Sequence, residues 1–458
     1  MTLGGRKKRA RKNSRLERRG GMQWVVKDGS VCGGAGSVVV VGAGLAGLTC
    51  AKVLAGAGRS VVVLEAGGEP GGRVASMRHA DGFILDRGFQ VLLDSYPAAR
   101  RHLDLPALGG GRFRSGALLV GRGRPVAIEN PLFRPAAVSA LVDAASPAWP
   151  DLWRLGVMVA GAAMRGSQSL ALEAGSARDV AAADLLAQRG FSADFLDRLA
   201  RPFLGGVLLD PALETSAAWM RACLAPFAFG RALLPGEGMG AIGRQLAAHL
   251  PPGSIRYNHR VEGVIATEAG LSGVRMSDGS VISAEAVVLA TDEPATCRLL
   301  GRGSPRGARA TAVHYFAADR AWHEGAWLCL PPRSVSGPVL HAALLTNAAP
   351  ELAPPGQRLW SVTVVPDHPA AADAERVAAE VAGWFGQRAE ELKSLDFMRV
   401  DYAVPLQPPG FAARPAPWGA LPRGLSVAGD AVVGASIDAT MRSGEVVAKS
   451  LLSPAGVN

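Results

Sequence analysis

The sequence is poor in the residue patterns that build metal sites and disulfide frameworks. Its five cysteines lie far apart without a CxxC pair, and its eight histidines include no HExxH pair. This spacing argues against structural zinc and disulfide bonds, and it is typical of a reducing compartment. We therefore expect no metal site, and a cytoplasmic location is the simplest hypothesis.

Long hydrophobic runs are also missing. No stretch reaches the roughly 18 apolar residues of a membrane span, and the nearest candidate, residues 155–164, ends at Arg165. Leu155, Val159 and Met164 roughly follow helical spacing, which favours a helix packed on the core. The alternative is a helix that dips one face into a membrane surface, so a peripheral membrane contact stays a second hypothesis.

Acidic residues are scarce at the start of the chain. Residues 1–21 hold nine Lys and Arg and one acid, Glu17, a net charge of +8 that leaves +2 of the chain's +10 for the remainder. Such a charge run is usually disordered, and we expect residues 1–36 to form a tail that catalysis does not need. No aromatic residues interleave these charges, which disfavours nucleic-acid binding. A targeting segment stays an alternative, which would place the protein in an organelle.

A glycine-rich turn after a buried strand is the most informative feature that is present. Residues 38–41 are four valines, as in a parallel strand buried on both faces. The GxGxxG pattern follows, and we predict ligand contacts for Gly42, Gly44, Leu45, Ala46 and Gly47. The first glycine permits the tight turn, the second lets a pyrophosphate approach the backbone, and the third lets the helix pack on the strand. The helix N-terminus adds free N–H groups and a positive dipole end.

Glu65 completes this motif. It follows a second apolar strand, residues 61–64, and lies 18 residues after Gly47. A carboxylate at this distance accepts hydrogen bonds from the hydroxyl groups of an adenosine ribose, and it disfavours a 2′-phosphate. The segment therefore predicts dinucleotide binding and argues against NADP.

Gly71, Gly72 and Arg73 form a second candidate contact soon after the acid. The two glycines would bring more backbone near the cofactor, and the guanidinium would neutralise phosphate charge. With these residues included, the run GAGLAGLTCAKVLAGAGRSVVVLEAGGEPGGR resembles the N-terminal signature of the flavin amine oxidase superfamily. That superfamily includes monoamine and polyamine oxidases, protoporphyrinogen oxidases and phytoene-desaturase-like enzymes.

The resemblance implies FAD as the cofactor and adds two contacts. Residues 86–90 resemble the element in which a glycine, here Gly88, lies against the flavin ring. Residues 255–261 resemble the strand whose valine, here Val261, contacts adenine.

The end of the chain resembles the family's last cofactor element. Gly429 and Asp430 are expected to end a buried strand, where the carboxylate would hold a ribityl hydroxyl. Ser436 and Ile437 begin the last helix, whose positive end would stabilise negative charge on reduced flavin. Gly444 would let that helix pack closely.

Because the cofactor segments are dispersed, the sequence predicts an α/β fold with a Rossmann-like FAD-binding domain and an inserted α+β substrate domain. We assign residues 37–94, 231–297 and 406–458 to the FAD-binding domain. Residues 95–230 and 298–405 then form the substrate domain. Residues 1–36 are the basic tail.

Three departures from the amine oxidases bear on the chemistry. No lysine lies between Lys52 and Lys393 to hold a water over the flavin, no aromatic pair precedes Gly429, and no cysteine follows Cys329 to bond the flavin. The resemblance therefore implies non-covalent FAD and an enzyme of the desaturase or protoporphyrinogen-oxidase type, which takes a hydride from a largely apolar small molecule.

Three other functions stay open: a flavin amine oxidase, an NAD-dependent dehydrogenase, and a non-redox binding protein like the Rab GDP-dissociation inhibitors. The electron acceptor, oxygen or a quinone, is not identified by the sequence. No residue stands out as a general base.

Overall fold

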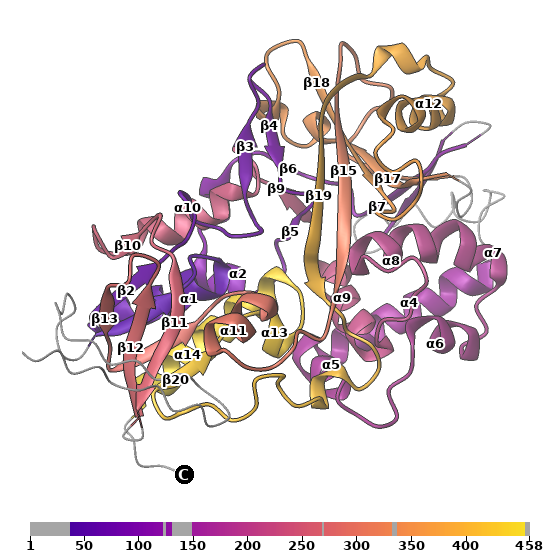
Figure 1. Ribbon diagram of the computed structural model, residues 1–458. Helices are drawn as coiled ribbons and strands as arrows, with labels where there is room; N and C mark the ends of the chain where they lie inside the picture. The colour runs from indigo at the N-terminus through magenta and orange to yellow at the C-terminus, as the bar shows by residue number, and fades with distance from the viewer. Residues whose placement is uncertain (1–36, 122–124, 131–148, 268–269, 332–336, 454–458) are drawn as a thin grey trace, which may run out of the picture.

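A parallel sheet of five strands lies at the lower left of Figure 1 in the computed structural model, which describes residues 37–121, 125–130, 149–267, 270–331 and 337–453. Its strands come from the start, the middle and the end of the chain, and every neighbouring pair is parallel. In sheet order they are β10 (Ile255–Arg256), β2 (Val61–Leu64), β1 (Val38–Val41), β14 (Ala286–Leu289) and β20 (Leu425–Val427). The predicted tail lies outside the described residues.

The four valines of β1 are all buried because the sheet is covered on both faces. Side chains alternate between the faces of a strand, so Val38 and Val40 pack in one core while Val39 and Val41 pack in another. Helices cover the first face. An antiparallel sheet covers the second; its strands are β11 (Val261–Thr267), β12 (Gly270–Met276) and β13 (Val281–Ser283).

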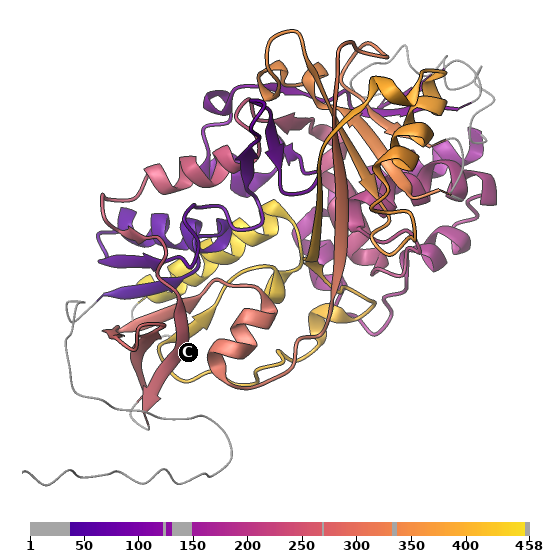
Figure 2. The ribbon, with the colours of Figure 1, turned by 45° about the horizontal axis from the view of Figure 1, so that its top comes forward.

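The first and last helices, α1 (Leu45–Gly56) and α14 (Ile437–Leu452), lie side by side on this sheet (Figure 2). Gly444 lies where they meet, and a Cβ atom there would come 2.1 Å from the carbonyl oxygen of Ala46. Only glycine permits this approach, so the close packing predicted for Gly444 is confirmed. The contact joins the two ends of the chain in one layer.

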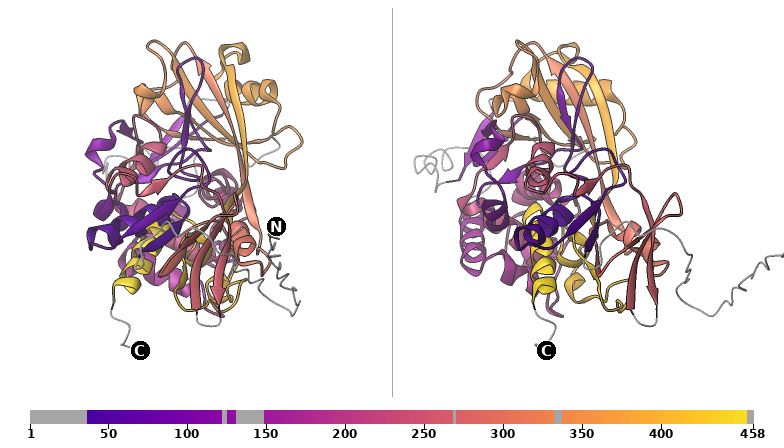
Figure 3. Two further views of the ribbon diagram at one scale, coloured as in Figure 1. Left: turned by 60° about the vertical axis from the view of Figure 1, so that its left-hand side comes forward. Right: turned by 90° about the vertical axis from the view of Figure 1, so that its left-hand side faces the viewer.

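A second sheet of seven strands stands above the first in both side views (Figure 3). All its neighbouring pairs are antiparallel except β16 with β7. In sheet order the strands are β19 (Lys393–Pro405), β15 (Ala308–Ala318), β18 (Arg358–Val364), β17 (Val339–Leu344), β16 (Leu328–Leu330), β7 (Gly116–Leu119) and β8 (Val126–Glu129). Helix α12 (Ala374–Phe385) packs on it through Val377, Val381 and Trp384. The long strands β15 and β19 run down towards the first sheet (Figure 1).

A group of helices lies beside the second sheet at the right of Figure 1. They are α4 (Trp149–Arg165), α5 (Ser167–Glu173), α6 (Ala182–Gln188), α7 (Ala193–Phe195), a π-helical turn (Leu196–Ala200), α8 (Arg201–Leu208) and α9 (Ala217–Phe229). The helix predicted around residues 155–164 is α4, and its Met158 and Ala162 are buried in the core of this group. The prediction that Met164 packs on the core is wrong, because Met164 is exposed on the same helix, as is Trp153. A membrane contact of that face stays a prediction. None of the helices in the described residues combines the length and the apolar composition needed to cross a bilayer.

Shorter elements connect these layers. The strands are β3 (Ser76–Arg78), β4 (Ile84–Asp86), β5 (Leu92–Leu93), β6 (Gly111–Arg112) and β9 (Ala232–Leu234). The helices are α2 (Pro97–His102), α10 (Gly240–Ala248), α11 (Glu293–Leu300) and α13 (Asp430–Val433), with 3-10 turns at Pro106–Leu108, Leu345–Asn347, Pro350–Leu352, Ala389–Glu391 and Phe411–Ala413.

The predicted α/β fold is confirmed. The parallel sheet is built from segments that lie before, between and after those that build the seven-stranded sheet, as expected of a domain with insertions. The residue boundaries assigned to the two domains stay a prediction.

Candidate functional site

A cavity of about 1310 Å³ is lined by residues of the seven-stranded sheet, by segments that follow strands of the parallel sheet, and by residues of the helices beside them. Thirteen of the fifteen residues that the sequence predicts as ligand contacts line this cavity. They are Gly42, Gly44, Leu45, Ala46, Glu65, Gly71, Gly72, Arg73, Gly88, Gly429, Asp430, Ser436 and Ile437.

The other two predicted residues, Gly47 and Val261, lie behind the cavity wall. A Cβ atom on Gly47 would come 2.0 Å from the carbonyl oxygen of Gly42, so this glycine serves the packing of α1 on β1. Val261 begins β11 and packs, half-buried, against the core of the antiparallel sheet. Its neighbour Arg260 lines the cavity instead. A cofactor contact of Val261 stays a prediction.

The two glycines at the start of the motif are required for different reasons. Gly42 has a φ of +103°, and a Cβ atom there would lie 2.7 Å from the carbonyl oxygen of Ala290. Gly44 has φ −72° and ψ 176°, an extended conformation that any residue adopts. A Cβ atom on Gly44 would meet no atom within 4 Å, apart from its chain neighbours and its own helix. Neither strain nor packing therefore explains the glycine at position 44.

Glu65 holds the glycine-rich segments in place at the end of β2. Its Oε2 accepts a hydrogen bond from the amide of Ala43 at 2.7 Å, and its Oε1 accepts one from the amide of Gly67 at 2.8 Å. The amide of Gly71 donates to the carbonyl oxygen of Ala43 at 2.8 Å, which joins the second glycine segment to the first. Glu65 thus lies in the cavity wall as predicted. Its charged carboxylate binds one amide in the first glycine-rich segment and one in the segment after β2.

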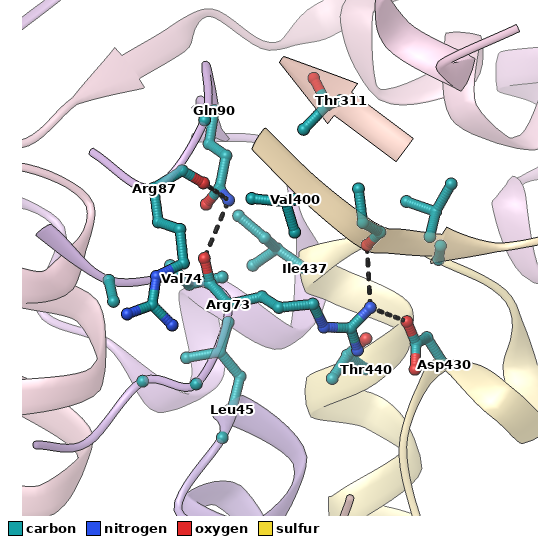
Figure 4. A pocket seen from close by; sticks show the side chains of 18 of the residues that line it. Leu45, Arg73, Val74, Arg87, Gln90, Thr311, Val400, Asp430, Ile437 and Thr440 are labelled. Carbon is teal, nitrogen blue, oxygen red and sulfur yellow. Dashed lines mark hydrogen bonds and ion pairs between the residues drawn. The ribbon is translucent and has the colours of Figure 1, made fainter. Parts of the chain in front are cut away.

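Arg73 and Asp430 form an ion pair, with 2.7 Å between Nη1 and Oδ2 (Figure 4). The same nitrogen donates to the carbonyl oxygen of Ala403 at 2.8 Å, and the guanidinium lies 5.5 Å from the ring centre of Tyr402. Burial lowers the pKa of Arg73, but the charge and hydrogen bond of Asp430 outweigh it, so the net shift is upward. Two residues 357 positions apart are therefore coupled in one wall of the cavity.

The sequence placed Asp430 at the end of a strand, and this position is wrong by three residues. Strand β20 ends at Val427, and Asp430 begins the short helix α13. The reason is Gly429, whose φ of +130° breaks the extended conformation and turns the chain. Asp430 is only 5% exposed and lines the cavity from this turn.

The N-terminus of α14 lines the same side of the cavity. The hydroxyl oxygen of Ser436 caps the helix by accepting from the amide of Ala439 at 3.0 Å, and Ile437 and Thr440 extend along the wall. Figure 4 places Ile437 and Thr440 beside the Arg73–Asp430 pair. The positive end of a sixteen-residue helix therefore meets the cavity.

Gly88 lies across the cavity, where its φ is +90° and its Cβ would lie 3.4 Å from Cγ2 of Thr311. The residue that holds this turn is the buried Asp86, which the sequence analysis did not assign. Asp86 Oδ1 accepts from the Ser76 hydroxyl at 2.5 Å and from the Met239 amide at 2.8 Å. Burial raises the pKa of Asp86 from 3.8 to about 6, although these hydrogen bonds oppose the shift. The sequence feature that could have identified Asp86 is its place between the apolar residues of β4 and the predicted contact Gly88.

The pKa of Asp86 predicts a pH-dependent stability. In the unfolded chain this carboxyl loses its proton near pH 4, whereas the fold keeps it protonated up to about pH 6. The folded state therefore binds more protons between these values, and its contribution to the free energy of unfolding falls as pH rises from 4 to 6, by about 2–3 kcal/mol. Asp86→Asn should lack this decrease. Urea unfolding of both proteins from pH 4 to pH 7 measures the difference, and parallel curves would contradict it.

An apolar wall closes the other end of the cavity. It consists of Phe203, Gly206 and Val207 from α8, Cys223 and Phe227 from α9, Leu328 from β16 and His341 from β17. Burial raises the pKa of the Cys223 thiol to about 12, so the thiol is neutral at ordinary pH. None of the residues that these four elements contribute to the cavity carries a carboxylate, a lysine or an arginine. The sequence predicts a largely apolar substrate but does not identify the residues of this wall, because helical and strand periodicity does not reveal which buried residues face a cavity.

Comparison with known proteins identifies relatives over most of the chain. The family model described as flavin-containing amine oxidoreductase matches residues 45–452. The phytoene dehydrogenase of Streptomyces griseus is 30% identical over 394 residues, which cover 71% of this chain and 72% of that protein. A solved structure of putrescine oxidase bound to putrescine has a TM-score of 0.65 at 19% identity, covering 91% of this chain and 98% of that one. A putative protoporphyrinogen oxidase from Exiguobacterium has a TM-score of 0.62 at 17% identity, with 91% and 98% covered.

Proposed function

The chain belongs to the family of flavin-containing amine oxidoreductases, and we propose that its cavity binds FAD without a covalent bond. As a member of this family the protein is an enzyme, an oxidoreductase with a flavin cofactor that acts on a small molecule. We propose that the flavin is FAD, that it is bound without a covalent link, and that the substrate is largely apolar.

The observation that carries the proposal is the space in front of Gly44. This glycine lines the cavity, needs no special backbone conformation and would have room for a side chain. A pyrophosphate placed against its backbone explains the missing side chain. The wall around it has the donors and acceptors that FAD requires: Glu65 for the adenosine ribose and Arg73 for the phosphates.

The rest of the cofactor would follow the cavity towards the apolar wall. Asp430 would accept from a ribityl hydroxyl, and the N-terminus of α14 at Ser436 and Ile437 would face the flavin ring, with Gly88 on its other side. FAD bound in this way would supply the acceptor for a hydride from a carbon atom of the substrate. The free cysteines among the described residues include Cys223 in the cavity wall, but its thiol is held neutral by burial, which disfavours covalent attachment.

The substrate that fits the apolar wall is a largely apolar molecule, dehydrogenated in a desaturase, dehydrogenase or oxidase reaction. The wall would bind it through apolar contact, orient its reacting carbon and exclude water. An amine oxidase is the alternative within the family. A protonated amine is favoured by a carboxylate that balances its charge, and the four elements of the apolar wall contribute no carboxylate to the cavity.

Substitution of Glu65 tests the FAD assignment. Glu65→Ala removes the proposed hydrogen bonds to the ribose, each worth about 1.5–3 kcal/mol, and also the bonds that position the amides of Ala43 and Gly67, so the FAD dissociation constant should rise at least tenfold. Flavin fluorescence during titration of the flavin-free protein measures this constant. Glu69→Ala is the matched control, because Glu69 lines the cavity nearby and has no role in the proposed site. Equal FAD affinity in Glu65→Ala and the wild type would overturn the assignment.

A further inference from the structure

His341 is the most unusual polar residue of the apolar wall. It lies on β17 with only 3% of its surface exposed, and it lines the cavity. Neither Nδ1 nor Nε2 has a hydrogen-bond partner anywhere in the part of the chain that the structure describes. Burial lowers the pKa of its ring to about 4, so the imidazole is neutral at pH 7 and presents one N–H donor and one bare acceptor.

The neighbours of His341 hold its ring but do not satisfy it. The ring of Phe89 packs against it edge-on, with 5.1 Å between the ring centres. Helix α8 passes so close that a Cβ atom on Gly206 would lie 2.5 Å from Nδ1. The glycine therefore makes room for the imidazole, and Phe89 and Gly206 both line the cavity with it. The ring is fixed in position at the cavity wall.

An unpartnered buried imidazole is unfavourable unless something else completes its hydrogen bonds. Leaving a buried donor or acceptor unsatisfied costs about 1–3 kcal/mol, and the large majority of such groups in proteins are paired. An apolar residue of similar size would avoid this cost at no loss of packing. The presence of histidine here is explained if a ligand in the cavity supplies the missing partner.

We propose that His341 hydrogen-bonds a neutral oxygen, a hydroxyl or a carbonyl, on an otherwise apolar substrate. The proposal rests on the function proposed above, in which the substrate occupies the apolar wall. A neutral donor and acceptor recognise a neutral oxygen, whereas a carboxylate or a phosphate would require the positive charge that the elements of this wall do not contribute. This single polar contact fixes which end of the molecule lies at β17, and it thereby selects the carbon that faces the flavin.

The test compares ligands that differ only in the oxygen. Primary alkanols from hexyl to dodecyl and the matching chloroalkanes displace the apolar dye Nile red from the protein, and the ratio of their affinities gives the preference for oxygen. In the wild type this ratio should exceed that of His341→Leu by about threefold to tenfold, the worth of one neutral hydrogen bond. His341→Asn, which keeps a donor and an acceptor, should retain part of the preference.

Two further variants separate hydrogen bonding from shape. Gly206→Ala keeps the imidazole but displaces it, so the preference should fall as in His341→Leu. Phe227→Leu alters the apolar wall without removing a polar side-chain atom. The affinities for the alkanols and for the chloroalkanes should therefore change by the same factor, and the preference for oxygen should stay. His341→Leu should also unfold at the same temperature as the wild type or higher, because no bond within the protein is lost. A clearly lower unfolding temperature would identify a structural bond and contradict the proposal.

The proposal is overturned if the wild type binds neither series, if it shows no preference, or if His341→Leu keeps the preference. Dye displacement does not require flavin, and it is measured on flavin-loaded and flavin-free protein alike. Absence of FAD would therefore defeat the proposed function without deciding the role of His341. Loss of the preference alone would defeat the role of His341 and leave the cofactor assignment intact.

Discussion

Replacing Gly44 with alanine should leave the protein folded and weaken FAD binding about 10- to 100-fold. The added Cβ meets no atom within 4 Å apart from its chain neighbours and its own helix, so the loss of stability should not exceed the roughly 1 kcal/mol that alanine costs at a helix N-cap. The same methyl group would fill the space in which a pyrophosphate approaches the backbone. Overpacking of this kind costs about 1–3 kcal/mol, and about 1.4 kcal/mol corresponds to a factor of ten. Thermal unfolding and FAD titration of the variant measure the two effects.

Gly42→Ala is the matched control for this prediction. Its Cβ would lie 2.7 Å from the carbonyl oxygen of Ala290, in a backbone conformation that L-residues rarely adopt. This variant should therefore be less stable than the wild type even in the absence of FAD. If Gly44→Ala is destabilised like Gly42→Ala, the glycine at position 44 has a structural role and does not point to a ligand. If it binds FAD normally, the cofactor does not lie against this turn.

Asp430→Ala should weaken FAD binding by at least tenfold and also destabilise the fold by about 2–3 kcal/mol. Loss of a hydrogen bond between a ribityl hydroxyl and a charged acceptor accounts for the first effect. The second arises because Arg73 would keep its charge without its partner. Breaking a fully buried pair costs about 3–5 kcal/mol, but the side chain of Arg73 is 34% exposed, so solvent reduces the loss. FAD titration and urea unfolding of the variant measure the two effects.

Asp430→Asn keeps the shape of the side chain and an acceptor oxygen but removes the charge. It should retain more FAD affinity than Asp430→Ala. In both variants the flavin potential should rise, because a negative charge near the ring opposes its reduction. An unchanged potential together with unchanged FAD affinity would remove the C-terminal segment from the proposed cofactor site.

The sequence predicted most of the residues that line the cavity beside the parallel sheet, because its signals there are local. Four consecutive valines, glycines at fixed spacing and an acid after the next strand define β1, α1 and β2 with little ambiguity, and the structure places these strands next to each other. The long-range part came from the family resemblance, which associated Asp430 with the first motif. Neither source predicted that Asp430 pairs with Arg73, since the direction of two side chains depends on the packed structure.

The apolar wall was less predictable for a physical reason. The residues of the apolar wall are ordinary core residues in their own helices and strands, and only the meeting of α8, α9, β16 and β17 turns one face of each towards the cavity. His341 illustrates the limit: in the sequence it is one scattered histidine among eight. Its unsatisfied nitrogens become apparent only when every neighbour is known.

The visible spectrum of the purified protein tests the central claim most directly. Protein with bound FAD is yellow and shows the absorbance bands of oxidised flavin. Acid precipitation should release the colour into the supernatant as FAD, because the proposed cofactor is not covalently bound. A supernatant that contains FMN in place of FAD, or colour retained in the pellet, would contradict the proposed cofactor or its attachment. A colourless protein that binds no FAD on titration would contradict the function itself.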